Sequence, residues 1–471
     1  MIKKISVVSL LAVLACISGC TVGPDYTAPE LPQKEFTEIL HNTEVEFAQN
    51  ADPNTYALWW EGLNDPLLTE LIKASLESNY DMKAAVARVQ QARAALGISE
   101  ADIWPTLDAA GSFSRTRYSQ DVRGGGEQNI HTLGLDASWE LDIFGGTRRA
   151  NEAARADLDA QQANLTDVWI SLAAEVAINY TDLRVAQKNL NVAYDNLKAQ
   201  TDTLDLLISR RKAGLNTQLA VEQARYNVET TRSTIPSIRR SIEAYANNIA
   251  LLTGVLPGTL HEKLMTDKAI PQPAENLLIS IPAEALRNRP DICRAERQLA
   301  AQTARVGQAT ADLYPKFRLN GSIGVEALRA DRMFSNGNDY YAAGPSANWN
   351  IFDAGRIRNS IKIQDALQEQ YLAQYEKTVL TAVKEVRDNL VAWNQEQLRL
   401  ESLTAAEAAA KDALYFANDQ YAAGLSDFNN VLDAQRALLT LQVSKVISEG
   451  QIVVDLIRLY KSLGGGWERP R

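Results

Sequence analysis

The sequence has few of the residues that usually carry chemistry. Among 471 residues there are only three cysteines, three histidines and four methionines. The histidines His41, His131 and His261 are dispersed, and no metal-ligand spacing occurs. The glycine run 124–126 lacks the Lys and Ser/Thr of a phosphate-binding loop, so we interpret it as a surface turn. We therefore expect no enzyme, no metal site and no bound cofactor.

Basic charge and long apolar runs are also scarce. The formal net charge of −10 argues against a nucleic-acid partner, because contacts to phosphates require a basic face. After the N-terminal segment no run of about 18 apolar residues occurs, so we expect no membrane-spanning helix. Since 46% of the residues are hydrophobic, the chain should nevertheless fold.

The N-terminal residues 1–19 predict a cleaved secretory signal, because Lys3 and Lys4 precede an apolar stretch. The following Ile17-Ser18-Gly19-Cys20 resembles a bacterial lipobox. That resemblance implies that Cys20 becomes the first mature residue and carries a covalent N-terminal lipid. The alternative is an ordinary signal peptide with an incidental cysteine. By the same resemblance Thr21, in place of an aspartate, favours the outer membrane.

The remaining cysteines allow no intrachain disulfide. Cys16 would leave with the signal and Cys20 would be acylated, which makes Cys293 the only free thiol. Cys293 falls in a predicted helix, where we expect a buried structural thiol.

The sequence repeats itself at an offset of 210 residues. WPTLDAAGSF at Trp104 returns as YPKFRLNGSI at Tyr314, and Ala-Gly-Leu at 213–215 returns at 423–425. Constant spacing over such a length predicts duplication of one large unit. We place the domains at 20–66 (an extended N-terminal segment), 67–255 (repeat 1), 256–282 (a Pro-rich linker), 283–465 (repeat 2) and 466–471 (the tail).

Each repeat is predicted to contain a helix, two strands and two long helices. Between Leu133 and Ile143 apolar and polar residues alternate strictly, which is typical of a strand. The four strands are expected at 104–118, 131–143, 314–328 and 340–352. The fourth is the weakest, because Pro345 interrupts it.

The long helices are expected in runs without proline, from Thr147 to Lys212 and from Arg356 to Ala422. A leucine recurs every seventh residue, which indicates one apolar seam facing a neighbouring helix: Leu183, Leu190, Leu197 and Leu204. At ~1.5 Å per residue such a helix is on the order of 100 Å long. A soluble coiled-coil rod is the alternative.

The alternating strands match the pattern of a transmembrane β-barrel, with one apolar and one polar face. Four strands cannot close a barrel, and eight would be filled by their own side chains, whereas 3 × 4 = 12 strands from three chains leave a pore. The predicted fold is therefore mainly α, with a trimeric 12-stranded transmembrane β-barrel continuous with a long α-helical barrel. Aromatic residues at the strand ends would mark the membrane interface: Trp104, Trp139, Tyr314 and Trp349. A soluble sheet with one buried face is the alternative.

Several motifs together carry a family resemblance: Cys20-Thr-Val-Gly-Pro-Asp-Tyr26, Trp139-Glu-Leu-Asp-Ile-Phe-Gly145, Ile351-Phe-Asp-Ala-Gly355 and Val431-Leu-Asp-Ala-Gln435. They resemble the TolC-type outer-membrane efflux proteins, and most of all the lipidated NodT-like branch. The resemblance implies a homotrimeric exit duct in the outer membrane of a Gram-negative bacterium, with its helical barrel in the periplasm. It also implies a periplasmic adaptor and an inner-membrane transporter of the resistance-nodulation-division class as partners, and passive export of drugs or other small toxic compounds.

Alternatives to this function are a duct for metal efflux or type I protein secretion, and, in a different class, a structural coiled-coil envelope lipoprotein without a pore. The resemblance also implies site residues at the helix tips. The tips that dock the adaptor would hold Arg211, Gly214, Leu215, Gly424 and Leu425. The periplasmic gate would contain Asp433, Asn430 and Tyr421. A ring of Asp433 side chains would favour cations; alternatively Asp433 is solvated or pairs with Arg436, and both glycines merely cap helices.

Overall fold

The computed structural model describes residues 21–29, 58–123, 125–266, 268–273 and 289–465. The chain divides into two units, and each contains parts of both repeats. The sheet unit comprises residues 1–30, 87–163 and 293–377, and the hairpin unit comprises residues 31–86, 164–292 and 378–471. The predicted signal 1–19 and Cys20 lie outside the described residues, as do most of the predicted segment 20–66 and the tail 466–471.

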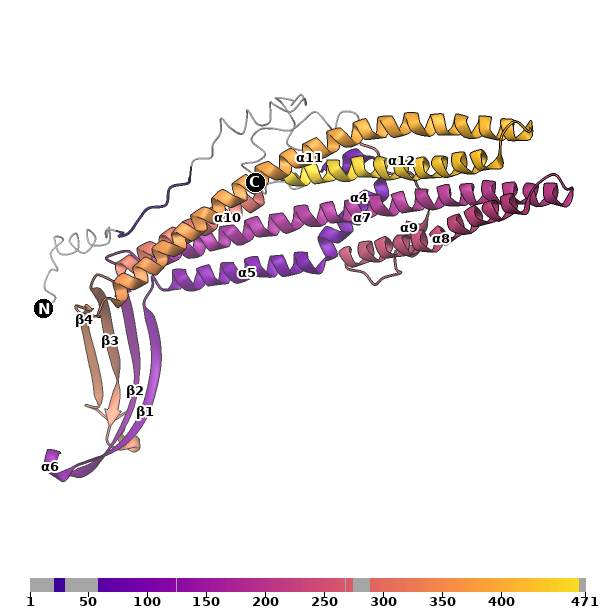
Figure 1. Cartoon of the computed structure of the whole chain (residues 1–471). Coiled ribbons are helices and arrows are strands. Elements are labelled where there is room, and N and C mark those ends of the chain that lie inside the picture. The colour runs from indigo at the N-terminus through magenta and orange to yellow at the C-terminus, as the bar shows by residue number, and fades with distance from the viewer. Residues whose placement is uncertain (1–20, 30–57, 124, 267, 274–288, 466–471) are drawn as a thin grey trace. The chain divides into compact units, whose positions relative to one another are not determined.

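The sheet unit contains one antiparallel sheet in the order β1-β2-β3-β4 (Figure 1). Its strands are β1 (Thr106–Tyr118), β2 (Gly126–Leu141), β3 (Lys316–Ala327) and β4 (Asp339–Asn348). Between the strands lie the short helices α6 (Gln120–Arg123) and η4 (Ala330–Arg332). Strands β2 and β3 pair with each other, so the central ladder joins the two repeats.

Two strand boundaries differ from those expected by four residues or more, and the others lie within two residues of the expected positions. β2 begins at Gly126, before the expected start at His131, because Gly126 already pairs with Tyr118 of β1. β4 ends at Asn348, before the expected end at 352, because Asn348 pairs with Lys316, the first residue of β3. Pro345 does not interrupt β4, since this strand lies at the edge of the sheet, where a missing N–H is tolerated.

The helices repeat in length as well as in sequence. α7 (Gly146–Lys212) and α11 (Arg356–Ala422) have 67 residues each, and α8 (Gln218–Leu252) and α12 (Phe428–Ser462) have 35 each. The single helix expected before β1 is broken at Asn79. The other helices are α4 (Pro66–Ser78), α5 (Tyr80–Ala101), α9 (His261–Met265), α10 (Pro290–Ala311) and the 3-10 turn η1 (Trp59–Leu63).

The core of the hairpin unit lies where η1 and α4 contact α7, α8 and α12. Trp59 and Trp60 are buried there, and the Trp59 ring stacks on Tyr460 with 5.8 Å between the ring centroids. The predicted leucine seam of α7 lies buried or half-buried along this helix. By length and composition α12 is the one described helix that could cross a membrane. Its Val453, Leu456 and Ile457 are buried in this core.

The duplication extends to individual hydrogen bonds. The Asn79 amide donates to the carbonyl of Leu252 at 2.9 Å, and at the matching positions in repeat 2 the Arg289 guanidinium donates to the carbonyl of Ser462. The indole N–H of Trp139 donates to the carbonyl of Ile103 at 2.8 Å, and that of Trp349 donates to Leu313 at 3.0 Å. Both repeats therefore use the same backbone contacts to fix helix ends.

We predict that Gly450→Ala weakens the packing of α12 on α7. A Cβ at Gly450 would lie 2.1 Å from Cγ2 of Val185, and a β-branched valine has little rotamer freedom in a helix. Overpacking of this kind costs about 1–3 kcal/mol, which should lower the midpoint of thermal unfolding in detergent. Val185→Ala in the same chain should restore the midpoint.

Gly97→Ala is the matched control, because Gly97 also lies inside a helix and a Cβ there meets nothing within 4 Å. It should leave the midpoint unchanged or raise it slightly, since alanine is the better helix former. An equal effect of the two substitutions would contradict the close contact between Gly450 and Val185.

Candidate functional site

One face of the sheet is polar from strand to strand. Asp108 lies opposite Asp136, and Ser138 lies opposite Asn320. The Asn320 amide donates to the hydroxyl of Ser346 on β4 at 2.9 Å, so hydrogen bonds cross the strands on this face. A shallow hollow on this face is lined by Asp108, Asp136, Ser138, Asn320 and the neighbouring Ser322. This face is suited to contact with water.

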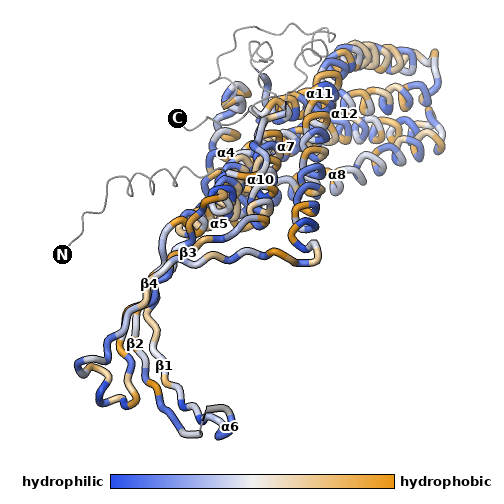
Figure 2. Tube along the Cα trace, turned by 90° about the vertical axis from the view of Figure 1, so that its left-hand side faces the viewer, coloured by the Kyte–Doolittle hydropathy of each residue, from blue (hydrophilic) through white to orange (hydrophobic). Residues whose placement is uncertain are grey.

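The other face of the sheet carries exposed apolar side chains. Ile323 lies opposite Leu135 on β2 and opposite Tyr341 on β4, which forms a continuous apolar row across three strands. All three side chains are exposed, as are Leu107 and Phe113 on β1. Alternating blue and orange segments follow the strands in Figure 2. An apolar face that no described residue covers is expected where a sheet contacts lipid.

The four predicted interface aromatics lie at the end of the sheet where the helices begin or end. Trp104 and Trp349 are exposed, and Trp139 is half-buried. Tyr314 stacks on Phe144 with 4.6 Å between the ring centroids. The indoles of Trp139 and Trp349 are fixed by their hydrogen bonds to Ile103 and Leu313. These positions suit the predicted interface role, which stays a prediction.

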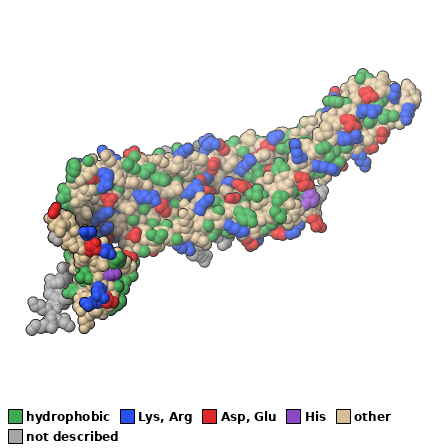
Figure 3. Space-filling view, turned by 90° about the horizontal axis from the view of Figure 1, so that it is seen from below, with side chains coloured by type: hydrophobic (Ala, Val, Ile, Leu, Met, Phe, Trp, Pro, Cys, Tyr) green, Lys and Arg blue, Asp and Glu red, His purple; other side chains and the backbone are tan. Residues whose placement is uncertain are grey.

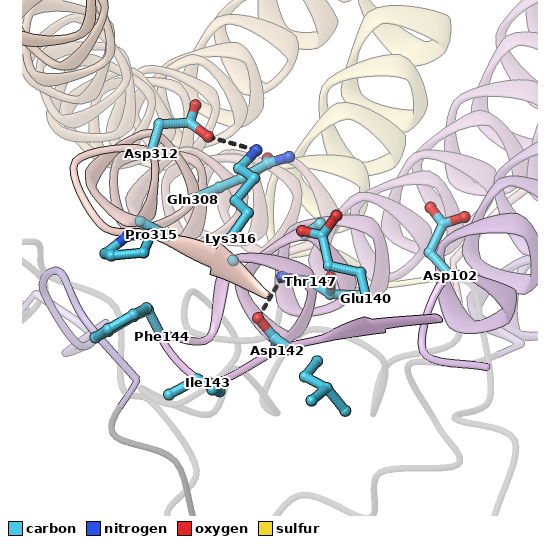
Figure 4. A pocket seen from close by; sticks show the side chains of 14 residues that line it. Asp102, Glu140, Asp142, Ile143, Phe144, Thr147, Gln308, Asp312, Pro315 and Lys316 are labelled. Carbon is cyan, nitrogen blue, oxygen red and sulfur yellow. Dashed lines mark hydrogen bonds and ion pairs between the residues drawn. The ribbon is translucent and has the colours of Figure 1, made fainter. Parts of the chain in front are cut away.

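A polar pocket of about 260 Å³ lies beside these aromatics, between the end of β2 and the start of β3 (Figure 4). Three of its carboxylates have partners: Asp312 pairs with Lys316 at 2.8 Å, Glu140 pairs with Arg318 at 2.8 Å, and Asp142 accepts from the backbone N–H of Thr147 at 3.1 Å. The Asp142 contact satisfies a free N–H in the first turn of α7. We assign this pocket a structural role.

Helices α7 and α8 form a first hairpin, and α11 and α12 form a second. The turn at the tip of each hairpin contains a glycine followed by an exposed leucine. Gly214 and Gly424 adopt φ of 72° and 75°, the left-handed conformation in which glycine ends a helix. The next residues, Leu215 and Leu425, are 76% and 81% exposed. Arg211 is exposed one turn earlier. The tips thus offer two similar surfaces, each centred on a leucine that no described residue covers.

Behind the tips a small core joins the two hairpins. It contains Leu207, Ala220, Val221 and Ala224 from the first hairpin, and Phe428, Val431 and Leu432 from the second. Polar contacts cross between the hairpins beside this core. The Asn216 amide donates to the Tyr421 hydroxyl at 3.0 Å, and the Arg436 guanidinium donates to Asn227 at 2.9 Å. The Arg210 guanidinium also lies over the Tyr421 ring, 5.2 Å from the ring centroid.

The two polar residues expected at the gate have local partners in the chain. The Asp433 side chain is 74% exposed and lies 3.5 Å from the Arg436 guanidinium, the contact that the alternative interpretation expected. The Asn430 amide donates to the Ser426 hydroxyl at 2.7 Å. Arg436 therefore contacts both Asp433 and Asn227, and links the expected gate residue to the neighbouring hairpin.

Arg210 and Asn227 were not expected at the tips, and neither the hydrogen bond of Asn216 to Tyr421 nor that of Arg436 to Asn227 was expected. The signal that could have found them is the repeat itself. At the offset of 210, Asn216 corresponds to Ser426 and Tyr421 corresponds to Arg211, so the hydrogen bond between them exists once per chain.

The expectation that Cys293 is a buried thiol is wrong. Cys293 is half-buried in α10 and not fully buried, because it lies at the margin of that helix's packed face.

On the face of the molecule shown in Figure 3, acidic and basic side chains are interspersed. In the part of the chain that the structure describes, no group of three or more His, Cys, Asp or Glu side chains could hold a metal ion.

Comparison with solved structures identifies this fold as that of an outer-membrane channel. The chain superimposes on the outer-membrane channel OprN with a TM-score of 0.87 at 33% identity, covering 95% of this chain and 100% of OprN. It is 31% identical to nodulation protein T of Rhizobium leguminosarum bv. viciae, covering 97% of this chain and 92% of that protein. It is also 31% identical to the toluene efflux pump outer membrane protein TtgF of Pseudomonas putida, covering 97% of this chain and 96% of that protein.

The pattern of the outer membrane efflux protein family matches residues 71–255 and 281–465, one match in each repeat. The chain belongs to the outer membrane efflux protein family. The predicted family, the fold class and the outer-membrane location are thereby confirmed. The lipid on Cys20 and the roles of the individual tip and gate residues stay predictions.

Proposed function

We propose that this chain is the exit duct of a tripartite efflux pump, anchored in the outer membrane by a lipid on Cys20. It passively carries drugs or other small toxic compounds that an inner-membrane transporter of the resistance-nodulation-division class and a periplasmic adaptor deliver. The observation that carries the proposal is the sheet of an outer-membrane efflux protein with one polar and one uncovered apolar face.

The sheet supports assembly of three copies. β1 and β4 are the edges of the four-stranded sheet, so each leaves a row of backbone groups that no other described strand pairs with. In a bilayer such groups must be paired, which pairing with neighbouring copies achieves. Three copies give about 12 strands, enough for a water-filled lumen lined by the polar face.

The tips support the docking of an adaptor. Leu215 and Leu425 are exposed apolar side chains at the turns of the two hairpins, beside the backbone of Gly214 and Gly424. Three copies would present six such tips in a ring. An adaptor with matching apolar pockets would bury the leucines, and Arg211 would supply a polar contact at the rim.

We predict that Leu425→Glu disrupts adaptor docking, because it would place a charge in the apolar contact. The native host carrying this variant should accumulate a fluorescent dye that such pumps export, while the purified channel keeps its conductance. Leu256→Glu is the matched control, since Leu256 is 80% exposed but lies away from the tips, in the loop before α9. Export at the wild-type rate by the Leu425 variant would exclude this leucine from the docking surface.

The contacts behind the tips support a closed resting state. Hydrogen bonds of Asn216 to Tyr421 and of Arg436 to Asn227 hold the two hairpins of one chain together. Asp433 lies on the exposed side of α12 next to this link. In a trimer, three copies of Asp433 near the axis would form a carboxylate ring that binds cations and blocks the duct.

We predict that Asp433→Ala raises the resting single-channel conductance in planar bilayers several-fold and removes block by divalent cations. The substitution removes the proposed carboxylate ring and the ion pair with Arg436. Asp412→Ala, which removes an exposed carboxylate from α11, is the matched control and should behave like the wild type. Unchanged conductance of the Asp433 variant would remove this residue from the gate.

The function as a whole is tested by purifying the chain in detergent. A duct gives a heat-labile trimer on gels and discrete conductance steps in a bilayer, whereas a structural rod gives neither. Crosslinking in the native membrane then identifies the adaptor and the transporter by mass spectrometry. A soluble monomer would contradict the proposed function.

A further inference from the structure

The described segment Thr21–Tyr26 lies against the sheet unit directly after the predicted lipid attachment site. The Val22 N–H donates to the carbonyl of Phe144 at 3.2 Å, just beyond the end of β2. Gly145 adopts φ of 81°, and a Cβ there would lie 2.7 Å from the Thr21 side chain. The segment is therefore in close contact with the end of the strand.

Two glycines allow the segment to approach α10 at the level of the backbone. Gly23 adopts φ of 87°, and a Cβ there would lie 2.4 Å from Cα of Gly307. A Cβ at Gly307 would in turn lie 2.8 Å from the Arg149 side chain. A larger residue at Gly23 would separate the segment from α10, and a larger residue at Gly307 would displace the Arg149 side chain.

Arg149 of α7 is buried beneath the segment, with a side chain only 4% exposed. Its guanidinium donates to the carbonyls of Val22 at 3.2 Å and Gly23 at 3.5 Å, and to the carboxylate of Asp25 at 2.6 Å. The fourth acceptor is Glu152 at 2.7 Å, one turn along α7. Three of the four groups that satisfy this buried cation thus come from the N-terminal segment.

Tyr26 fixes the other end of the segment. Its hydroxyl donates to the Glu296 carboxylate of α10 at 2.6 Å, and its ring packs on Ala156, Ala300 and Ala301. These alanines come from both α7 and α10, so Tyr26 contacts the two repeats at once.

Among the residues that the structure describes, the duplicated position has no such site. At the offset of 210, Arg149 corresponds to Asn359 and Gly307 corresponds to Gly97. A Cβ at Gly97 would meet nothing within 4 Å, whereas Gly307 is in tight contact. The close packing at Gly307 is therefore specific to the N-terminal segment and is not a general feature of the repeat.

We propose that residues 21–26 form a strap whose receptor is the surface of Arg149, Glu296 and Gly307, and that its docking positions the lipid-bearing N-terminus at the end of β2. Consecutive Cα atoms are about 3.8 Å apart, so a docked Thr21 keeps the attachment point beside Phe144 and the interface aromatics. Arg149 is the positioning residue. The positioning of a lipid rests on the proposed function, whereas the docking does not.

The test follows cleavage of the purified, detergent-solubilised full chain by chymotrypsin after Tyr26. Cleavage there requires the strap to undock, so its rate tracks the open population. Intact mass spectrometry reports the loss of the peptide up to Tyr26 together with its lipid. Gly23→Ala should accelerate this cleavage at least about tenfold, a change of 1.4 kcal/mol in docking, while the midpoint of thermal unfolding stays unchanged.

Matched controls separate docking from general destabilisation. Gly258→Ala introduces the same substitution at a glycine with φ of 92° and open space around it, and should leave cleavage after Tyr26 unchanged. Arg149→Gln should accelerate cleavage as Gly23→Ala does, and Arg149→Lys, which keeps the charge, should give an intermediate rate. Arg155→Gln, at an exposed arginine of the same helix, should have no effect.

Wild-type cleavage rates for both the Gly23→Ala and the Arg149→Gln variants would overturn the proposal. So would acceleration by Gly258→Ala or Arg155→Gln equal to theirs. The rate of cleavage after Tyr26 does not depend on an open pore. A failure of the conductance experiments would therefore not affect the test of strap docking. A released peptide without lipid would contradict the anchor on Cys20 while leaving the docking of the strap measurable.

Discussion

A four-stranded sheet with two unpaired edges and an uncovered apolar face is the constraint on which the rest of this structure depends. β1 and β4 each present free backbone groups, and Ile323, Leu135 and Tyr341 present an apolar row to the surroundings. In water both features would promote aggregation, whereas in a bilayer the apolar face is satisfied and the edges require partners. The proposed trimer meets both requirements with copies of the same chain.

The duplication explains how one chain supplies such a sheet, and the contacts that break it occur at the tips and at the N-terminal segment. The two repeats keep the same bonds at their helix ends, from Trp139 to Ile103 and from Trp349 to Leu313. They differ at the tips, where Asn216 meets Tyr421, and at the N-terminal strap, where Arg149 has no equivalent. Each of these contacts occurs once per chain, and the residues at the matching positions of the other repeat are different. The internal symmetry of the two repeats is therefore broken at the tips and at the strap.

Much of the fold was predictable because it depends on local periodicity. Alternation between Leu133 and Ile143 predicted β2, and the runs without proline predicted α7 and α11 almost to their ends. The strand boundaries were less accurate, because β2 begins where Tyr118 offers it a partner and the alternation does not extend that far. Of the candidate site, the glycine turns at the tips were visible in the sequence. The bond of Arg436 to Asn227 was not, because it joins helices from different repeats.

The sequence by itself determined the duplicated unit, the two faces of each strand and the lengths of the long helices, since all of these follow from spacing along the chain. Its motifs also indicated the family, by their resemblance to those of known members. Only the tertiary structure decided which side chains satisfy one another. It placed Asp433 beside Arg436, and the segment of Val22, Gly23 and Asp25 over a buried Arg149. The physical reason is that a buried or crowded polar group is stabilised by whichever partner the packing brings within hydrogen-bond distance, and that partner can be far away in the sequence.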